Sequence, residues 1–169
     1  MALPVLDTPQ EAARWLRARV TGQLQADSRQ VRVGDGFIAW PGAATDGRRF
    51  VGAALAQGAR ACLVEEEGAD AFDLKDAAIA AYPHLKAGTS LVADAYYEHP
   101  SRALQMVAIT GTNGKTSTAW WVSTVLSKLQ LPALSPCGLV GTLGIGVAPA
   151  VESTGMTTPD PALLQRRLR

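Results

Sequence analysis

The sequence predicts an α/β fold, in which short apolar strands alternate with helices. Two runs, GFIAW at residues 36–40 and ARACLVEE at residues 59–66, have the composition of buried strands, and Gly or Pro lies beside each. Helical patterns lie before and between them, at residues 8–20 and 48–58. Because strands separated by helices form a sheet with helices packed on it, we expect this architecture in the first part of the chain.

The first helix has a clear start signal. Thr8 is the expected N-cap, Pro9 stands at the first helical position, and Glu11 completes a capping box with Thr8. Apolar residues then recur at helical spacing, at Ala12, Trp15, Leu16 and Val20. One face of this helix is therefore expected to be buried.

Three more boundaries complete the first part of the chain. The helix at 48–58 is expected to end at Gly58, since glycine is the common residue just past a helix end. A strand is expected near residues 78–82. The stretch at residues 85–101 is expected to contain a helix that stops before Pro100.

A second unit is expected to follow. Residues 105–110 (QMVAIT) have the pattern of a buried strand, residues 115–130 of a helix, and residues 136–146 of the next strand with glycine-rich ends. These pieces make two strands of a parallel sheet and leave the apolar faces of its helices uncovered. We therefore expect the start of a parallel-sheet domain, without its remainder.

The last stretch, residues 157–169, begins one more expected helix. Thr158 is its candidate N-cap and Pro159 its first position. The predicted organisation is a complete α/β domain at residues 1–100 and an incomplete one at residues 101–169.

Composition and charge exclude several classes of protein. The chain is 47% hydrophobic and 18% charged, and we find no apolar run of membrane-spanning length and no signal-peptide pattern. A net charge of +1 gives no case for nucleic-acid binding. Residues 1–100 hold 10 Lys/Arg and 13 Asp/Glu, whereas residues 101–169 hold 6 and 2. The excess of basic residues in the second part suits an anionic ligand there.

Cysteines and histidines indicate no metal site. Cys62 and Cys137 have neither a metal-binding nor a redox spacing, and we interpret them as buried thiols of a cytosolic protein. His84 and His99 are far apart and have no partner motif.

Residues 107–121, VAITGTNGKTSTAWW, have the pattern of a phosphate-binding loop between a strand and a helix. Gly111 and Gly114 allow a sharp turn and leave room for phosphate beside the backbone. The helix that follows offers unpaired N–H groups at its N-terminus. Lys115 can reach the β- and γ-phosphates of ATP, and the hydroxyl of Thr116 is placed to bind Mg²⁺.

The loop departs from the standard pattern at one position, where Ile109 replaces the first glycine. A tight strand-to-helix turn with an exposed lysine is the competing interpretation. The apolar strand before the loop, the helix after it and the hydroxyls at residues 116–118 favour phosphate binding. The later glycines within residues 138–146 lack the order of a dinucleotide site and indicate a twisted strand or loop.

The loop TGTNGKTST resembles the ATP-binding loop of the Mur ligase family, which departs from the usual pattern in the same way. Three more stretches resemble the MurE type of that family. Residues 27–59 are similar to its N-terminal domain, YYEHPS at residues 96–101 to its domain junction, and GTLGIG with TGMTTPD, within residues 141–160, to the segment after its ATP loop.

The resemblance implies an ATP-dependent ligase of peptidoglycan synthesis in the cytoplasm. Such enzymes add a third amino acid to UDP-N-acetylmuramoyl-L-alanyl-D-glutamate, and we expect meso-diaminopimelate to be the diamino acid added here. ATP phosphorylates the D-glutamate carboxylate, and the incoming amine then displaces phosphate. An acyl phosphate forms only if the γ-phosphate is held in line with the carboxylate, and Mg²⁺ offsets the crowded negative charge.

The resemblance also assigns roles to individual residues. It implies that Lys115 is catalytic, that Thr116 binds Mg²⁺ and that the whole loop holds ATP. The loop residues are Gly111, Thr112, Asn113, Gly114, Lys115, Thr116 and Ser117. The implied UDP-substrate contacts are Ser28, Ala43, Ala44, Thr45, Thr157 and Thr158.

Some features of these residues separate this sequence from the family pattern. The family often has more polar residues where Ala43 and Ala44 stand, so these two can offer only backbone groups or surface contact. Without the resemblance, Ser28 would be read as part of an ordinary polar turn, and Thr158 as a helix cap.

The resemblance implies that a modified lysine and a glutamate that hold Mg²⁺ lie beyond residue 169. It implies that the domain that selects the amino acid also lies there. We therefore expect residues 1–169 alone to be inactive and to self-associate through the residues after Met106. We also expect them to bind the UDP-substrate weakly and ATP poorly.

Two alternatives stay open. Another ligase of the superfamily, such as a folylpolyglutamate synthase, would share the ATP loop but have no UDP-binding domain before it. A nucleotide-binding module that regulates without catalysis would fit a short chain with no visible catalytic base. A long open reading frame downstream would favour the ligase, and a natural stop codon after Arg169 the regulatory module.

Overall fold

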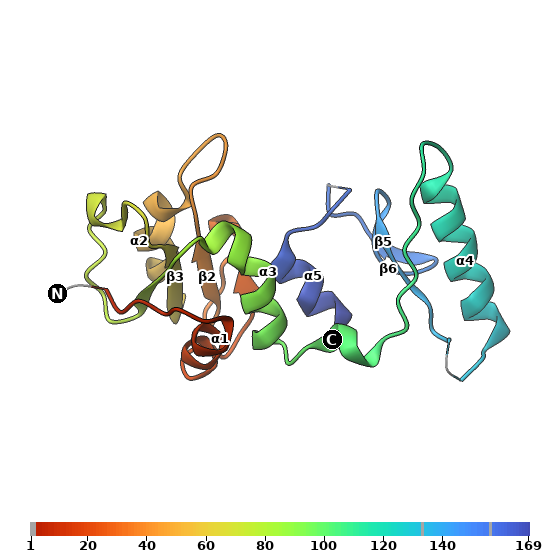
Figure 1. Cartoon of the computed structure of the whole chain (residues 1–169), viewed down its shortest axis with the longest axis horizontal. Helices are drawn as coiled ribbons and strands as arrows, with labels where there is room; N and C mark the ends of the chain where they lie inside the picture. Colours follow the sequence, from red (N-terminus) through yellow and green to blue (C-terminus); the bar gives the residue numbers. More distant parts are fainter. Residues whose placement is uncertain (1–2, 133, 156) are drawn as a thin grey trace. The chain divides into compact units, whose positions relative to one another are not determined.

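The structure, a computed structural model, describes residues 3–132, 134–155 and 157–169 (Figure 1). Met156, within the TGMTTPD stretch, lies outside the described residues. The chain divides into two compact units. The first runs to Pro100 and includes Pro161–Arg167 and Arg169, and the second comprises Ser101–Asp160 and Leu168.

The first unit is built on a four-stranded parallel sheet in the order β1-β2-β3-β4. The predicted strands at 36–40, 59–66 and 78–82 are confirmed, whereas the short strand β1 escaped the sequence patterns. Because all four strands run in one direction, the segments that follow them leave the sheet at the same edge. The strands are β1 (Leu24–Gln25), β2 (Gly36–Ala39), β3 (Ala61–Glu65) and β4 (Ile79–Tyr82).

Helices cover both faces of this sheet (Figure 1). On one face, Ile38 and Leu63 pack in a core with residues of α1, α3 and α5. On the other face, the neighbouring residues Phe37 and Cys62 pack with residues of α2. Adjacent strand residues thus point to opposite cores, as the two-residue period of a strand requires. The helices are α1 (Pro9–Arg17), α2 (Val51–Ala56), α3 (Leu85–Tyr96) and α5 (Pro161–Leu168), with 3-10 turns η1 (Ser28–Gln30), η2 (Gly47–Phe50), η3 (Ala69–Ala71) and η4 (Pro100–Ala103).

The capping box of α1 is confirmed. The amide of Glu11 donates to the hydroxyl of Thr8 at 3.2 Å, and the carboxylate of Glu11 accepts the amide of Thr8 at 3.3 Å. Pro9 occupies the first helical position, where no N–H is needed. Helix α1 therefore begins at the residue that the sequence predicts.

The second unit differs from its expected sheet. The helix α4 (Lys115–Leu129) is confirmed, but residues 105–110 form no strand, and Val107 is 72% exposed. The predicted strand at 136–146 is a hairpin instead. Its strands belong to a three-stranded antiparallel sheet of β5 (Gly138–Gly141), β6 (Gly144–Val147) and β7 (Ala150–Glu152).

Glycine allows the close pairing of β6 with β7. Gly144 has a φ of +123°, and a Cβ there would lie 1.9 Å from the carbonyl oxygen of Glu152. Only glycine permits this approach of β6 to β7. Since β5, β6 and β7 pair with one another, residues 105–110 find no strand partner among the described residues of this unit.

The last helix begins later than predicted. Its first residue is Pro161, so the assignment of Thr158 as N-cap and Pro159 as first position is wrong. The reason lies in Asp160, because a residue before proline is disfavoured in the helical conformation. Helix α5 is grouped with the first unit, where Ala162 is fully buried. No helix in the described ranges has the length and apolarity to span a membrane.

Candidate functional site

The glycine loop before α4 takes a conformation that requires its glycines. Gly111 has a φ of +142°, and Gly114, the N-cap of α4, has a φ of +78°. Side chains with a Cβ are strained at such angles. Both glycines singled out in the sequence therefore shape the turn.

The start of α4 offers unpaired donors. The amide of Thr118 donates to the carbonyl of Gly114 at 2.9 Å, which is the first bond of the helix. The amides of Lys115, Thr116 and Ser117 precede it and have no backbone acceptor among the described residues. Unpaired N–H groups at a helix N-terminus bind phosphate oxygens well. The loop therefore fits a phosphate group.

Lys115 lies folded over its own loop. Its ammonium donates to the carbonyl of Gly111 at 2.6 Å and contacts the carbonyl of Thr112 at 3.5 Å. The side chain is exposed, so it can exchange these carbonyls for phosphate oxygens. The hydroxyl of Thr116, in the first turn of α4, is half-buried and supplies one oxygen of the kind that Mg²⁺ binds.

Two other predicted site segments lie at the carboxyl edge of the first sheet. Ser28 begins η1 after β1 and is half-buried. Ala43, Ala44 and Thr45 are exposed in the loop after β2. Because β1 and β2 are adjacent and parallel, both segments leave the same edge, which is where open α/β sheets bind ligands.

The loop after β2 is closed on itself and anchored by a charged pair. The amide of Gly42 donates to the carbonyl of Thr45 at 2.9 Å. Asp46 then pairs with Arg48 at 2.7 Å, and the hydrogen bonds from Arg48 hold the pKa of the Asp46 carboxyl below its ordinary value of 3.8. Sequence analysis missed Arg48. The available signal was an arginine two residues after an aspartate that caps a turn.

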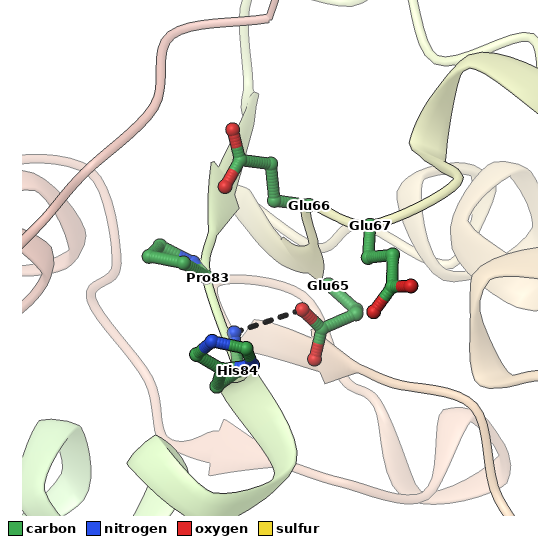
Figure 2. A pocket seen from close by; sticks show the side chains of 5 residues that line it. All are labelled: Glu65, Glu66, Glu67, Pro83 and His84. Atoms are coloured by element: carbon green, nitrogen blue, oxygen red, sulfur yellow. Dashed lines mark hydrogen bonds between the residues drawn. The ribbon is translucent and has the colours of Figure 1, made fainter.

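A further hollow, of about 390 Å³, lies at this edge. It is lined by the last residue of β3 and by residues that follow β3 and β4 (Figure 2). A carboxylate oxygen of Glu65 accepts the amide of His84 at 2.9 Å, which joins the ends of the two strands. The other lining residues are Glu66, Glu67 and Pro83. Negative charge at this point disfavours the placement of phosphates there.

The remaining predicted residues are Thr157, Thr158 and the two cysteines. Thr157 and Thr158 are exposed in the second unit, and their contact with substrate stays a prediction. Cys62 is buried in the first unit as expected, and burial raises the pKa of its thiol to about 12. Cys137 is only half-buried, so its assignment as a buried thiol is wrong.

Comparison with known families agrees with the order of these elements. The model of the Mur ligase family, catalytic domain, matches residues 22–110. The chain belongs to the Mur ligase family. The Mur ligase middle domain matches residues 109–169, which include the glycine loop and α4.

Curated relatives in the Mur ligase family are much longer than this chain. It is 61% identical over 168 residues to the UDP-N-acetylmuramoyl-L-alanyl-D-glutamate--2,6-diaminopimelate ligase of Acidovorax sp. strain JS42, covering 98% of the chain and 34% of the relative. The enzyme of the same name from Pseudomonas aeruginosa PAO1 is 46% identical over 146 residues, which is 86% of the chain and 29% of the relative. The chain thus spans about a third of the length of these Mur ligases.

Solved structures of Mur ligases are also similar. A UDP-N-acetylmuramoyl-L-alanyl-D-glutamate--2,6-diaminopimelate ligase matches with a TM-score of 0.60 and 30% identity, over 86% of this chain and 28% of that one. MurF ligase from Thermotoga maritima in complex with ADP matches with a TM-score of 0.51 and 25% identity, over 69% of this chain and 24% of that one.

Proposed function

We propose that this chain supplies the UDP-substrate domain and the ATP loop of a ligase that adds meso-diaminopimelate to UDP-N-acetylmuramoyl-L-alanyl-D-glutamate. The observation that carries the proposal is the turn at residues 111–117, where three unpaired amides and an exposed ammonium gather at a helix N-terminus. Support comes from relatives named as ligases of this glutamate and 2,6-diaminopimelate.

The loop is proposed to hold the triphosphate of ATP. The amides of Lys115, Thr116 and Ser117 would bind its oxygens, and the ammonium of Lys115 would leave the carbonyl of Gly111 to contact the transferring phosphate. Thr112 and Asn113 complete the turn around the phosphates. The substrate carboxylate attacks the γ-phosphorus, ADP leaves, and the amine of the diamino acid then displaces phosphate from the acyl group.

Thr116 is proposed to bind Mg²⁺. Its hydroxyl is one oxygen ligand, and Mg²⁺ commonly completes its shell with substrate phosphates and water. Bound there, Mg²⁺ supplies positive charge that offsets the charge of the phosphates. The other protein groups for this step are expected outside residues 3–169.

The UDP-substrate is proposed to bind at the carboxyl edge of the first sheet. Ser28 and the loop with Ala43, Ala44 and Thr45 contact the uridine diphosphate end. Thr157 and Thr158 contact the dipeptide end. The reaction belongs to peptidoglycan synthesis and is placed in the cytoplasm, where nucleotide-linked precursors and ATP are made.

Phosphate release by the complete gene product tests the proposal. We expect release that needs ATP, Mg²⁺, UDP-N-acetylmuramoyl-L-alanyl-D-glutamate and meso-diaminopimelate together. L-lysine in place of meso-diaminopimelate is the control for the amino acid, and UDP-N-acetylmuramate is the control for the dipeptide. Equal release with lysine would overturn the assigned amino acid, and no dependence on the UDP-dipeptide would overturn the ligase.

A further inference from the structure

Arg48 is a charged residue inside the first unit. It is 7% exposed, and it is the second residue of η2 directly after the loop with Ala43, Ala44 and Thr45. A buried guanidinium is tolerated only when its donors are paired. The partners of Arg48 therefore show why an arginine stands at this position.

Those partners come from two different segments. Toward the loop after β2, Arg48 donates from Nε to Asp46 at 3.0 Å and from Nη2 at 2.7 Å. Toward the segment after β3, its Nη1 donates to the carbonyls of Glu65 at 3.2 Å and Glu67 at 2.5 Å. Its guanidinium carbon also lies 4.7 Å from the centre of the Phe72 ring. The planar fork of arginine makes all these contacts at once.

The loop has few other attachments. Its internal bonds, such as Gly42 to Thr45, close it on itself. Among the described residues, the side-chain hydrogen bonds of residues 41–46 all run between Asp46 and Arg48. The guanidinium is therefore the side-chain link that ties this loop to the end of β3.

We propose that Arg48 is a positioning residue, which holds the loop of residues 42–45 in the shape that receives the uridine diphosphate end of the substrate. The inference rests on the proposed function. Ala43 and Ala44 have no polar side chain to offer a ligand, so the placement of their backbone groups decides what they can bind. A residue that fixes that backbone then sets the affinity without touching the substrate.

The expected loss of affinity depends on the fraction of molecules in which the loop keeps the receptive shape. If the released loop keeps the receptive shape in about one molecule in ten, the apparent dissociation constant rises about tenfold. The Arg48→Met variant keeps the apolar stem and removes every donor. The Arg48→Lys variant keeps a charge for Asp46 but loses the fork, so its affinity should lie between those of Arg48→Met and the parent.

Calorimetric titration of the complete gene product with UDP tests the inference. We expect about tenfold weaker binding by Arg48→Met, partial recovery in Arg48→Lys, and parent affinity in the matched control Arg49→Met, because Arg49 is exposed. Amide signals of Ala43, Ala44 and Thr45 should shift in NMR spectra of Arg48→Met, while those of Leu63 and Val64 in β3 stay in place.

The outcomes separate the two proposals. Parent-like affinity in a folded Arg48→Met variant overturns the positioning role and leaves the proposed function intact. A parent chain that does not bind UDP overturns the UDP-substrate assignment itself. If Arg48→Met fails to fold, Asp46→Ala provides the second measurement, because it removes both oxygens that accept from the guanidinium and leaves the contacts of Arg48 with the carbonyls of Glu65 and Glu67. Parent affinity in that variant also overturns the inference.

Discussion

The two units of the chain differ in how their apolar side chains are covered. In the first, Leu16 and Leu63 are fully buried, on α1 and β3. In the second, Trp121 is 66% exposed and Val125 is 54% exposed on α4. Among the described aliphatic and aromatic side chains of residues 101–160, proline aside, those that are buried are Leu139 and Ile145.

The difference teaches what a periodic sequence needs in order to form a core. In the first unit, the apolar side chains of the four strands pack against those of the helices on each face of the sheet, so both sets are buried. In the second, α4 packs mainly against the β5–β6 hairpin. Its remaining apolar side chains line an open hollow of about 280 Å³ at Trp121, Val122, Val125 and Leu126.

The largest expected effect concerns chemistry in the second unit. In the complete gene product, Lys115→Ala should reduce turnover by roughly two to four orders of magnitude, because a preorganised charge on the transferring phosphate is lost. Affinity for UDP, whose contacts we assign to the first unit, should change little. Steady-state phosphate release and calorimetry measure the two quantities separately.

Lys128→Ala is the matched control, since Lys128 lies in the last turn of the same helix. It should keep the parent turnover. Parent turnover in Lys115→Ala would show that the loop has no part in the mechanism. A loss of affinity for UDP in Lys115→Ala would contradict the division of roles between the units.

The next effect concerns stability. Leu63→Ala empties a fully buried site in the first unit and should lower the free energy of unfolding by about 2–5 kcal/mol. Trp121→Ala removes a larger but exposed side chain and should change the free energy of unfolding by less than about 0.5 kcal/mol. Urea unfolding measures both. Equal losses would show that the two units are equally well packed.

The same tryptophan is expected to matter for association. We expect the 169-residue chain to self-associate through exposed apolar side chains after Met106, so Trp121→Ala should lower the scattering mass. Leu91→Ala is the control, because Leu91 is 59% exposed in the first unit. A monodisperse parent monomer would contradict this expectation.

The smallest effect is a pH dependence in the first unit. Arg48 lowers the pKa of Asp46 in the folded chain, so the pair stabilises the fold above the ordinary value of 3.8. This contribution is lost progressively as the pH falls from 3.8 through the lower pKa of the folded state, because the unfolded chain binds the proton first. The stability gap between the parent and Asp46→Asn should therefore be wider at pH 7 than at pH 3, as measured by urea midpoints. A gap that does not narrow would contradict the pairing.

Local signals predicted the first unit well, and the reason is physical. The capping box at Thr8 acts through neighbours in sequence, so it is visible before folding. The apolar runs of β2 and β3 also identify themselves, because both faces of the sheet are covered. The strand β1 was missed because two residues are too few to show a period.

What depends on distant partners could not be predicted. Residues 105–110 have the composition of a buried strand, but a strand also needs a paired neighbour. Arg48 was not identified from the sequence, because its acceptors at Glu65 and Glu67 are remote from it in sequence. The start of α5 at Pro161 could have been predicted, because Asp160 precedes a proline and is therefore disfavoured in the helical conformation.

The strand order of the first sheet also bears on how the chain folds during synthesis. Because each strand pairs with the one made just before it, a nascent chain can extend the sheet one strand at a time. The segment before α1 is the exception. Pro4 and Leu6 bond to Ala81 in β4, each at 2.9 Å, so this segment, which is made before all four strands, must wait for β4. This closure spans the greatest sequence distance in the sheet and is the contact we expect to form last.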